Sequence, residues 1–136
     1  RIKAAKENFK RYGKTDRICL LEGDAADVLT ELSAQGNQYE FIFMDAAKGQ
    51  YLNFLPNILK MLPENGMLIT DNVLQDGDVI QSRYAINRRD RTIHGRMREY
   101  LYTLTHHGEL ETVVLPVGDG ATLSVKLPEK EQNAQP

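Results

Sequence analysis

The sequence predicts an α/β fold with a mostly parallel sheet, helices packed around it and an antiparallel strand pair at its C-terminal edge. Stretches with helical spacing alternate with short apolar runs. Two of these runs, YEFIFMD (39–45) and GMLITDN (66–72), are continuously apolar until their polar ends, as in parallel strands buried on both faces. The stretch ETVVLPVGDGATLSVKL (111–127) contains two β-runs around a turn, which predicts the antiparallel pair.

Composition predicts one ordinary soluble domain. The 136 residues are 41% hydrophobic and 26% charged, with a formal net charge of -2, so no overall basicity drives the chain toward nucleic acid or a membrane. No apolar run approaches the ~20 residues that span a bilayer. Cys19 is the only cysteine, so an intrachain disulfide is excluded. We expect this residue to be a small buried apolar side chain. We expect a cytoplasmic protein without membrane contact.

The first elements are a helix, a strand and a second helix. RIKAAKENFKRYG (1–13) has amphipathic helical spacing that ends at Gly13. It begins inside the helical pattern without a methionine, so we expect a further segment before it. RICLL (17–21) reads as a short strand. Asp24 is a candidate N-cap for the helix that follows, whose apolar stripe is Val28, Leu29 and Leu32.

A third helix is predicted between the two apolar strands, over residues 51–62. Pro56 lies within it, so either the helix starts at that proline or it is kinked there. Residues 73–87, after the second of these strands, show no clear period, which predicts a mobile loop that can act as a lid.

The last helix is predicted over residues 88–105. Its apolar stripe consists of Ile93, Met97, Leu101 and Leu104. Five arginines occupy the remaining positions: Arg88, Arg89, Arg91, Arg96 and Arg98. They are most simply a solvated face, and a phosphate-contacting surface is the alternative. The three histidines do not form a metal set and are expected at the surface or facing a partner.

The candidate chemistry lies where the apolar runs end. Asp45 follows the first run, and Asp71 and Asn72 follow the second. Since ligands of such sheets bind at the carboxyl ends of the strands, these side chains are expected to converge. Carboxylate and amide oxygens suit Mg²⁺, and also Mn²⁺ or Ca²⁺. The alternative is that each is a simple capping or turn residue. Lys48 is either an ordinary surface lysine or, near a divalent cation, an amine that accepts a proton from a substrate hydroxyl.

Five motifs in this order resemble a known family: GDA, FIFMDAAKGQY, GMLITDNVL with a following glycine, the arginine-rich helix and LPVGDGATLSVK. Together they are similar to the cation-dependent class I S-adenosylmethionine O-methyltransferases, which include catechol and caffeoyl-CoA methyltransferases. The motifs DAAKGQY and PVGDG most resemble the bacterial branch that contains the tRNA wobble 5-hydroxyuridine methyltransferase.

The resemblance implies a role for each candidate site residue. It implies that Asp45, Asp71 and Asn72 bind Mg²⁺ or Mn²⁺ and that Lys48 is the catalytic general base. It also implies that Asp24 and Ala25 contact the adenine of S-adenosylmethionine and that Asp45 belongs to the cofactor site as well.

The resemblance further implies a Rossmann-like methyltransferase sheet of seven strands in the order 3-2-1-4-5-7-6, with strand 7 antiparallel. The chain would hold this sheet from the third strand onward. The glycine-rich first turn and the acidic residue that grips the ribose would then lie upstream of Arg1. Residues 1–127 would be the C-terminal portion of the domain, and residues 128–136 a polar tail.

The function that follows is metal-dependent O-methylation, with 5-hydroxyuridine at the tRNA wobble position as the expected substrate. The same chemistry on a small catechol-like or acyl-CoA hydroxyl is the first alternative. A non-catalytic α/β interaction module, in which the acidic strand ends only cap turns, is the second. We also expect a homodimer.

Overall fold

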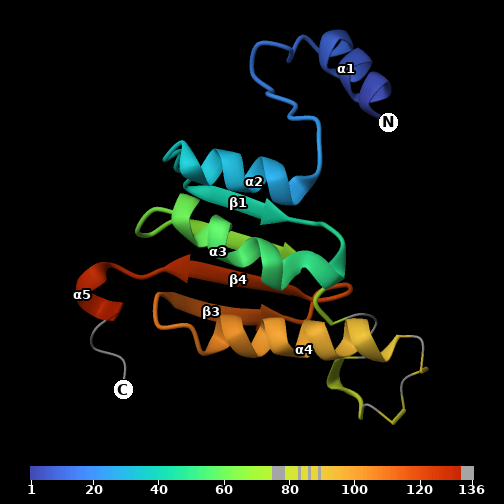
Figure 1. The fold of residues 1–136 in the computed structure, drawn as a ribbon, viewed down its shortest axis with the longest axis vertical. Helices are drawn as coiled ribbons and strands as arrows, with labels where there is room; N and C mark the ends of the chain where they lie inside the picture. Colours follow the sequence, from blue (N-terminus) through green and yellow to red (C-terminus); the bar gives the residue numbers. More distant parts are fainter. Residues whose placement is uncertain (75–78, 83, 86, 89, 133–136) are drawn as a thin grey trace.

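The described residues, 1–74, 79–82, 84–85, 87–88 and 90–132 of a computed structural model, contain a four-stranded sheet with the order β1-β2-β4-β3 (Figure 1). The strands are β1 (Phe41–Met44), β2 (Met67–Asp71), β3 (Leu110–Leu115) and β4 (Ala121–Lys126). β1 and β2 run parallel, whereas β4 lies antiparallel to both β2 and β3. The predicted α/β class with an antiparallel C-terminal strand is confirmed.

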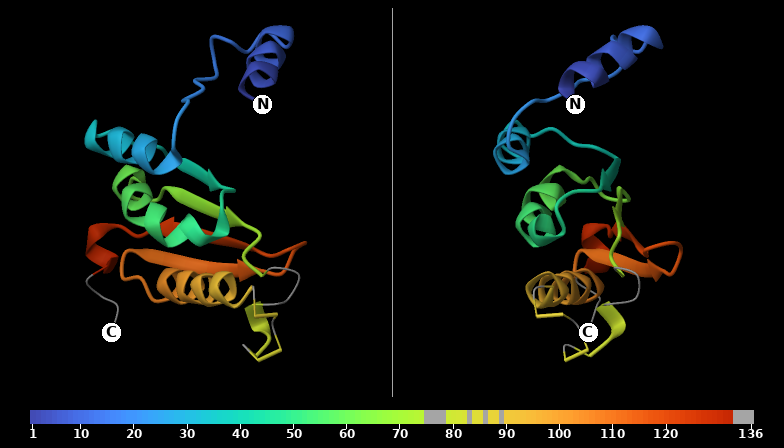
Figure 2. Two further views of the ribbon diagram at one scale, coloured as in Figure 1. Left: turned by 45° about the vertical axis from the view of Figure 1, so that its right-hand side comes forward. Right: turned by 90° about the vertical axis from the view of Figure 1, so that its right-hand side faces the viewer.

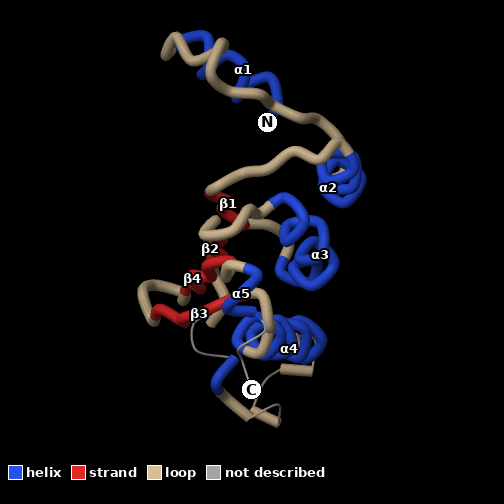
Figure 3. The backbone as a smooth tube through the Cα atoms, turned by 90° about the vertical axis from the view of Figure 1, so that its left-hand side faces the viewer, coloured by secondary structure: helices blue, strands red, loops and turns tan. Residues whose placement is uncertain are grey.

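The helices are α1 (Ile2–Arg11), α2 (Ala25–Ala34), the 3-10 turn η1 (Lys48–Gln50), α3 (Tyr51–Met61), α4 (Arg91–Thr105) and α5 (Glu129–Gln132). Figures 2 and 3 show α2, α3 and α4 side by side on one face of the sheet. α1 lies apart from this body, beyond an extended connection (Figure 1). Among the described residues, no helix has the length and apolar character needed to cross a membrane.

The alternation of side chains along the strands defines a covered face and an open face. Met44 in β1 and Leu68 and Thr70 in β2 are buried toward the helices. Phe41 and Phe43, which alternate with Met44, remain 58% and 55% exposed. Because successive strand residues point to opposite faces, these phenylalanines lie on the face that α2, α3 and α4 leave open.

The core lies between the sheet and α3 with α4. α3 contributes Phe54, Leu55 and Ile58 to it. Tyr51 and Tyr100 meet edge to face, with ring centroids 5.4 Å apart, and join the two helices. Such aromatic pairs contribute about 0.5–1.5 kcal/mol beyond the area that they bury.

A buried hydroxyl pair anchors α4 to β2. The Tyr100 and Thr70 hydroxyls lie 2.6 Å apart, and both side chains are fully buried. Burial raises the pKa of the Tyr100 phenol well above its ordinary value, and the hydrogen bond with Thr70 opposes this rise only in part. The phenol therefore stays neutral at physiological pH and keeps its hydrogen bond.

The buried stripe of α4 differs from the expected one by one helical position. Ile93 is 41% exposed, whereas His94 is 2% exposed and faces the core beside Met97. The His94 Nε2 atom lies 3.3 Å from the Gln81 carbonyl oxygen, which gives the buried ring a polar partner. The expectation that all three histidines lie at the surface is wrong for His94.

The expected strand over residues 17–21 is absent, and Cys19 is exposed rather than buried. A strand needs a neighbour for its backbone N–H and C=O groups, and none of the described strands pairs with this segment. One ion pair, between Lys6 and Glu22, links α1 to the end of the segment.

The remaining elements follow the sequence pattern. α3 begins at Tyr51, so Pro56 lies inside the helix, where it is exposed. Of the loop expected over residues 73–87, residues 75–78, 83 and 86 lie outside the described part of the chain. Val73 is fully buried at its start.

Candidate functional site

Two predicted carboxylates come from corresponding positions of neighbouring parallel strands. In the register of β1 and β2, Met44 is paired with Thr70. Asp45 and Asp71 directly follow these paired residues, at the ends of β1 and β2. Because neighbouring strands lie about 4.8 Å apart, this register brings their backbones together at the carboxyl edge of the sheet. The backbones of these two residues thus lie at the same sheet edge, and the convergence of their side-chain oxygens stays a prediction.

The phenol of Tyr51, the first residue of α3, lies between the two strand ends. Its hydroxyl donates to the Asp71 carbonyl oxygen at 3.1 Å and accepts from the Ala46 N–H at 3.4 Å. Burial raises the pKa of Tyr51, the Ala46 hydrogen bond opposes the rise, and the charges of Asp45 and Asp71 add to it. Both carboxylates thus act on the same buried hydroxyl, which remains protonated at neutral pH.

Asn72 follows Asp71 in a left-handed backbone conformation, with φ of 58°. Asparagine adopts this conformation more readily than most residues. The Asn72 N–H donates to Asp71 Oδ1 at 2.7 Å. This local bond fixes one carboxylate oxygen of Asp71 beside the Asn72 backbone.

The turn between β3 and β4 supports the backbone just after Asn72. The Val73 N–H donates to the Gly120 carbonyl at 3.0 Å, and the Leu74 N–H donates to the Asp119 carbonyl at 2.8 Å. Gly120 has φ of +79°, and a Cβ on it would lie 2.7 Å from both Leu74 Cβ and Leu74 Cδ1. The close approach of this turn to Leu74 therefore requires glycine.

Gly120→Ala is expected to lower the free energy of unfolding by about 2–4 kcal/mol, because overpacking adds to the ~1–2 kcal/mol cost of left-handed alanine. Gly118→Ala is the matched control, since Gly118 also has positive φ but open space around its Cβ position. Denaturant unfolding of both variants measures the difference. A Leu74→Ala change should recover part of the loss in Gly120→Ala, and equal losses for the two glycine variants would contradict the contact.

Lys48 lies three residues after Asp45 and opens η1, where it is half-buried. Arg96 of α4 donates from Nη1 to the Gly49 carbonyl at 2.8 Å. This hydrogen bond holds η1 against α4. The turn that carries Lys48 is thus fixed to the helical layer at the same end of β1 as Asp45.

A cavity of about 310 Å³ is lined by two of the three predicted cofactor residues, Ala25 and Asp45. Its remaining wall is mostly apolar and includes Leu21, Val28, Phe43, Met44, Phe54 and Ile58. The size and lining are typical of a small-molecule site, with few polar groups in an apolar hollow. Asp24 instead caps α2, because its Oδ1 accepts from the Ala26 N–H at 2.9 Å.

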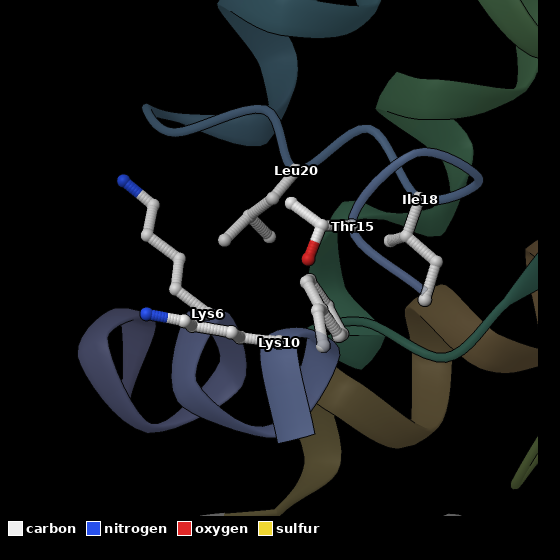
Figure 4. Close-up of a pocket in the computed structure, with 6 residues that line it drawn as sticks. Lys6, Lys10, Thr15, Ile18 and Leu20 are labelled. Carbon is white, nitrogen blue, oxygen red and sulfur yellow. The ribbon is translucent and has the colours of Figure 1, made fainter. Parts of the chain in front are cut away.

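A larger hollow, of about 510 Å³, lies between α1 and the segment that follows it. Lys6 and Lys10 of α1 line it together with Thr15, Ile18 and Leu20 of that segment (Figure 4). It contains no carboxylate and none of the predicted site residues. The cavity beside Asp45 is therefore the better candidate for function.

The sequence alone did not reveal the parts played by Tyr51 and Arg96. Tyr51 is a conspicuous polar aromatic residue at the start of an amphipathic helix, but its hydroxyl partners follow from the pairing of β1 with β2. The helical pattern places Arg96 on a solvated face, whereas its contact with Gly49 joins segments 47 positions apart in the sequence.

The donor set at the strand ends fits a hard divalent cation. Asp45, Asp71 and Asn72 offer oxygen atoms, which Mg²⁺ and Mn²⁺ accept. Within the described part of the chain, no group of three or more His, Cys, Asp or Glu side chains is arranged to hold a metal ion. A site here would therefore combine the two carboxylates with the Asn72 amide oxygen and with water or substrate oxygens.

The open α/β sheet, with a cavity and acidic residues at its carboxyl edge, defines a nucleotide- or cofactor-binding class of fold. The O-methyltransferase family model matches residues 1–127. The chain belongs to this O-methyltransferase family.

Curated relatives agree with this assignment. Caffeoyl-CoA O-methyltransferase 1 of Eucalyptus globulus is 32% identical over 118 residues, which cover 85% of this chain and 48% of the relative. The caffeoyl-CoA O-methyltransferase of Citrus natsudaidai is 33% identical over 123 residues, covering 88% of this chain and 53% of the relative. The chain thus spans about half the length of these relatives.

Solved structures share the fold. A Staphylococcus aureus protein, provisionally described as a caffeoyl-CoA O-methyltransferase, has a TM-score of 0.81 and 30% identity, with 92% of this chain and 59% of that chain covered. The SAH-bound Podospora anserina methyltransferase PaMTH1 has a TM-score of 0.77 and 29% identity, with coverage of 93% and 56%. The four strands described here therefore belong to a Rossmann-like methyltransferase sheet.

Proposed function

We propose that the protein is a metal-dependent O-methyltransferase that uses S-adenosylmethionine. The observation that carries the proposal is that Asp45 and Asp71 directly follow the paired residues Met44 and Thr70 at one sheet edge, next to a cavity that Asp45 itself lines. Asp45 both lines the cavity and lies at the same sheet edge as Asp71, so it can serve two neighbouring binding sites. Membership in the O-methyltransferase family and likeness to an SAH-bound relative support the cofactor.

Different residues of the chain would bind the cation, bind the cofactor and accept the proton. Asp45, Asp71 and Asn72 would hold Mg²⁺ or Mn²⁺, and the cavity with Ala25 and Asp45 would hold part of the cofactor. When bound, S-adenosylmethionine supplies an electrophilic methyl group, and the cation supplies Lewis acidity that lowers the pKa of a substrate hydroxyl. Lys48 accepts the hydroxyl proton at Nζ.

The substrate class that the relatives favour is a small hydroxyl compound of the catechol or acyl-CoA type. Both curated relatives described above are caffeoyl-CoA O-methyltransferases by name. A hydroxyl with a second oxygen beside it can chelate a cation through both atoms. Such chelation fixes the reacting oxygen relative to the methyl donor, which accounts for the use of a metal site in this reaction.

A tRNA substrate, 5-hydroxyuridine at the wobble position, is the second candidate. Its O5 and the neighbouring C4 carbonyl offer the same chelating pair. Arg88, just before α4, is exposed and free to face a phosphate backbone, which favours this candidate. Arg96 and Arg98 each donate one hydrogen bond to a backbone carbonyl, of Gly49 and Gln81, and both side chains remain exposed.

Methyl transfer from labelled S-adenosylmethionine to caffeoyl-CoA, a catechol and total tRNA, with and without chelator, tests the proposal. We expect transfer that stops in chelator and returns with Mg²⁺. A tRNA substrate should also lose affinity steeply between about 50 and 200 mM salt and weaken in Arg88→Ala, whereas a small substrate should not. Transfer that persists in chelator would contradict the metal, and absence of both transfer and cation binding would favour a non-catalytic module.

A further inference from the structure

We propose that the Tyr51 hydroxyl is a positioning group that sets the separation of Asp45 and Asp71 for cation binding. This inference rests on the proposed metal-dependent function. Tyr51 itself is 1% exposed, so it is placed to act on the site through its neighbours rather than on substrate.

The hydroxyl joins the two strand ends through backbone atoms. It donates to the carbonyl of Asp71 and accepts from the N–H of Ala46, the residue after Asp45. The same hydroxyl thus bonds to both chain segments, as a donor to one and as an acceptor from the other. Each segment carries one of the proposed cation ligands. The two segments are otherwise joined by the β1–β2 ladder, whose paired positions end at Met44 and Thr70.

The position of the hydroxyl is itself fixed by packing. Tyr51 begins α3, and its ring meets Tyr100 of α4 edge to face at 61°. A side chain held by two helices has few alternative rotamers, so its oxygen serves as a fixed spacer. Groups that orient metal ligands in this way typically change metal affinity by 10- to 100-fold.

Tyr51→Phe keeps the ring and its contact with Tyr100 but removes the spacer oxygen. Tyr100→Phe is the matched control, because it removes another buried tyrosine hydroxyl, paired with Thr70, that makes no contact with either strand-end ligand. Mn²⁺ is the probe, and its binding is followed by electron paramagnetic resonance and calorimetry on the whole protein. The melting temperature and the affinity for S-adenosylmethionine are measured in parallel.

We expect Tyr51→Phe to weaken Mn²⁺ binding about tenfold or more, to alter the Mn²⁺ resonance spectrum and to leave cofactor affinity within about twofold. Tyr100→Phe should lower the melting temperature and keep the wild-type Mn²⁺ affinity. Wild-type Mn²⁺ affinity in Tyr51→Phe, or equal losses in both variants, would overturn the positioning role while leaving the proposed function intact. No Mn²⁺ binding by the wild-type protein would overturn both.

Discussion

Replacing Asp71 with alanine is expected to abolish chelator-sensitive methyl transfer while the protein remains folded. Asp71 ends β2, and its carboxylate makes a local bond to the Asn72 N–H. Loss of that bond costs about 1 kcal/mol of stability. Loss of the carboxylate removes a cation ligand, for which a decrease in turnover of at least about 100-fold is expected, since groups that only orient ligands already contribute 10- to 100-fold.

Turnover with and without chelator, together with circular dichroism, measures this effect. Asp27→Ala is the control, because Asp27 is an exposed carboxylate in the first turn of α2 and takes no part in the candidate site. It should retain full turnover. An Asp71→Ala protein with undiminished, chelator-sensitive activity would show that the cation binds elsewhere.

Replacing Lys48 with methionine is expected to lower the turnover rate by about 10²- to 10⁴-fold, the usual contribution of a proton-transfer group. The affinity for S-adenosylmethionine should change much less, because the amine is expected to act on the substrate hydroxyl. Single-turnover rates at saturating cofactor and substrate measure the chemical step apart from product release.

Two further variants separate proton transfer from charge and from general surface effects. Lys48→Arg keeps a positive charge on a group that does not deprotonate in proteins, so it should be nearly as slow as Lys48→Met. Lys60→Met removes an exposed lysine of α3 and should leave the rate unchanged. A loss of only a few-fold in Lys48→Met would mean that another group takes up the proton.

The parts of the fold that the sequence predicts well are those defined by local pattern. The apolar runs of β1 and β2 are recognisable as strands from the sequence, although the expected burial on both faces is wrong for β1, where Phe41 and Phe43 stay exposed. The pattern of the β3–β4 hairpin is equally local. Residues 17–21 have a similar composition but form no strand, because a strand depends on a neighbour that composition does not specify. The exposure of Cys19 has the same cause.

Tertiary geometry decides what the sequence leaves open. Ile93 and His94 both lie at helical spacing from Met97, so periodicity cannot choose between them, and packing against the core selects His94. Asp45 and Asp71 can be predicted as neighbours because they end consecutive parallel strands. The role of the Tyr51 hydroxyl cannot be predicted in this way, since it requires the register of β1 against β2 and the path of α3 together.

The contact between the β3–β4 turn and the backbone after Asn72 also bears on biosynthesis. Residues 73 and 74 are held by carbonyls of residues 119 and 120, so the Asn72 side of the site lacks this support until that turn has left the ribosome. Contacts of such long sequence separation form late because the closure of the intervening chain costs entropy. The nascent chain would therefore acquire the support of the Asn72 side of the site only after residues 119 and 120 have been synthesised.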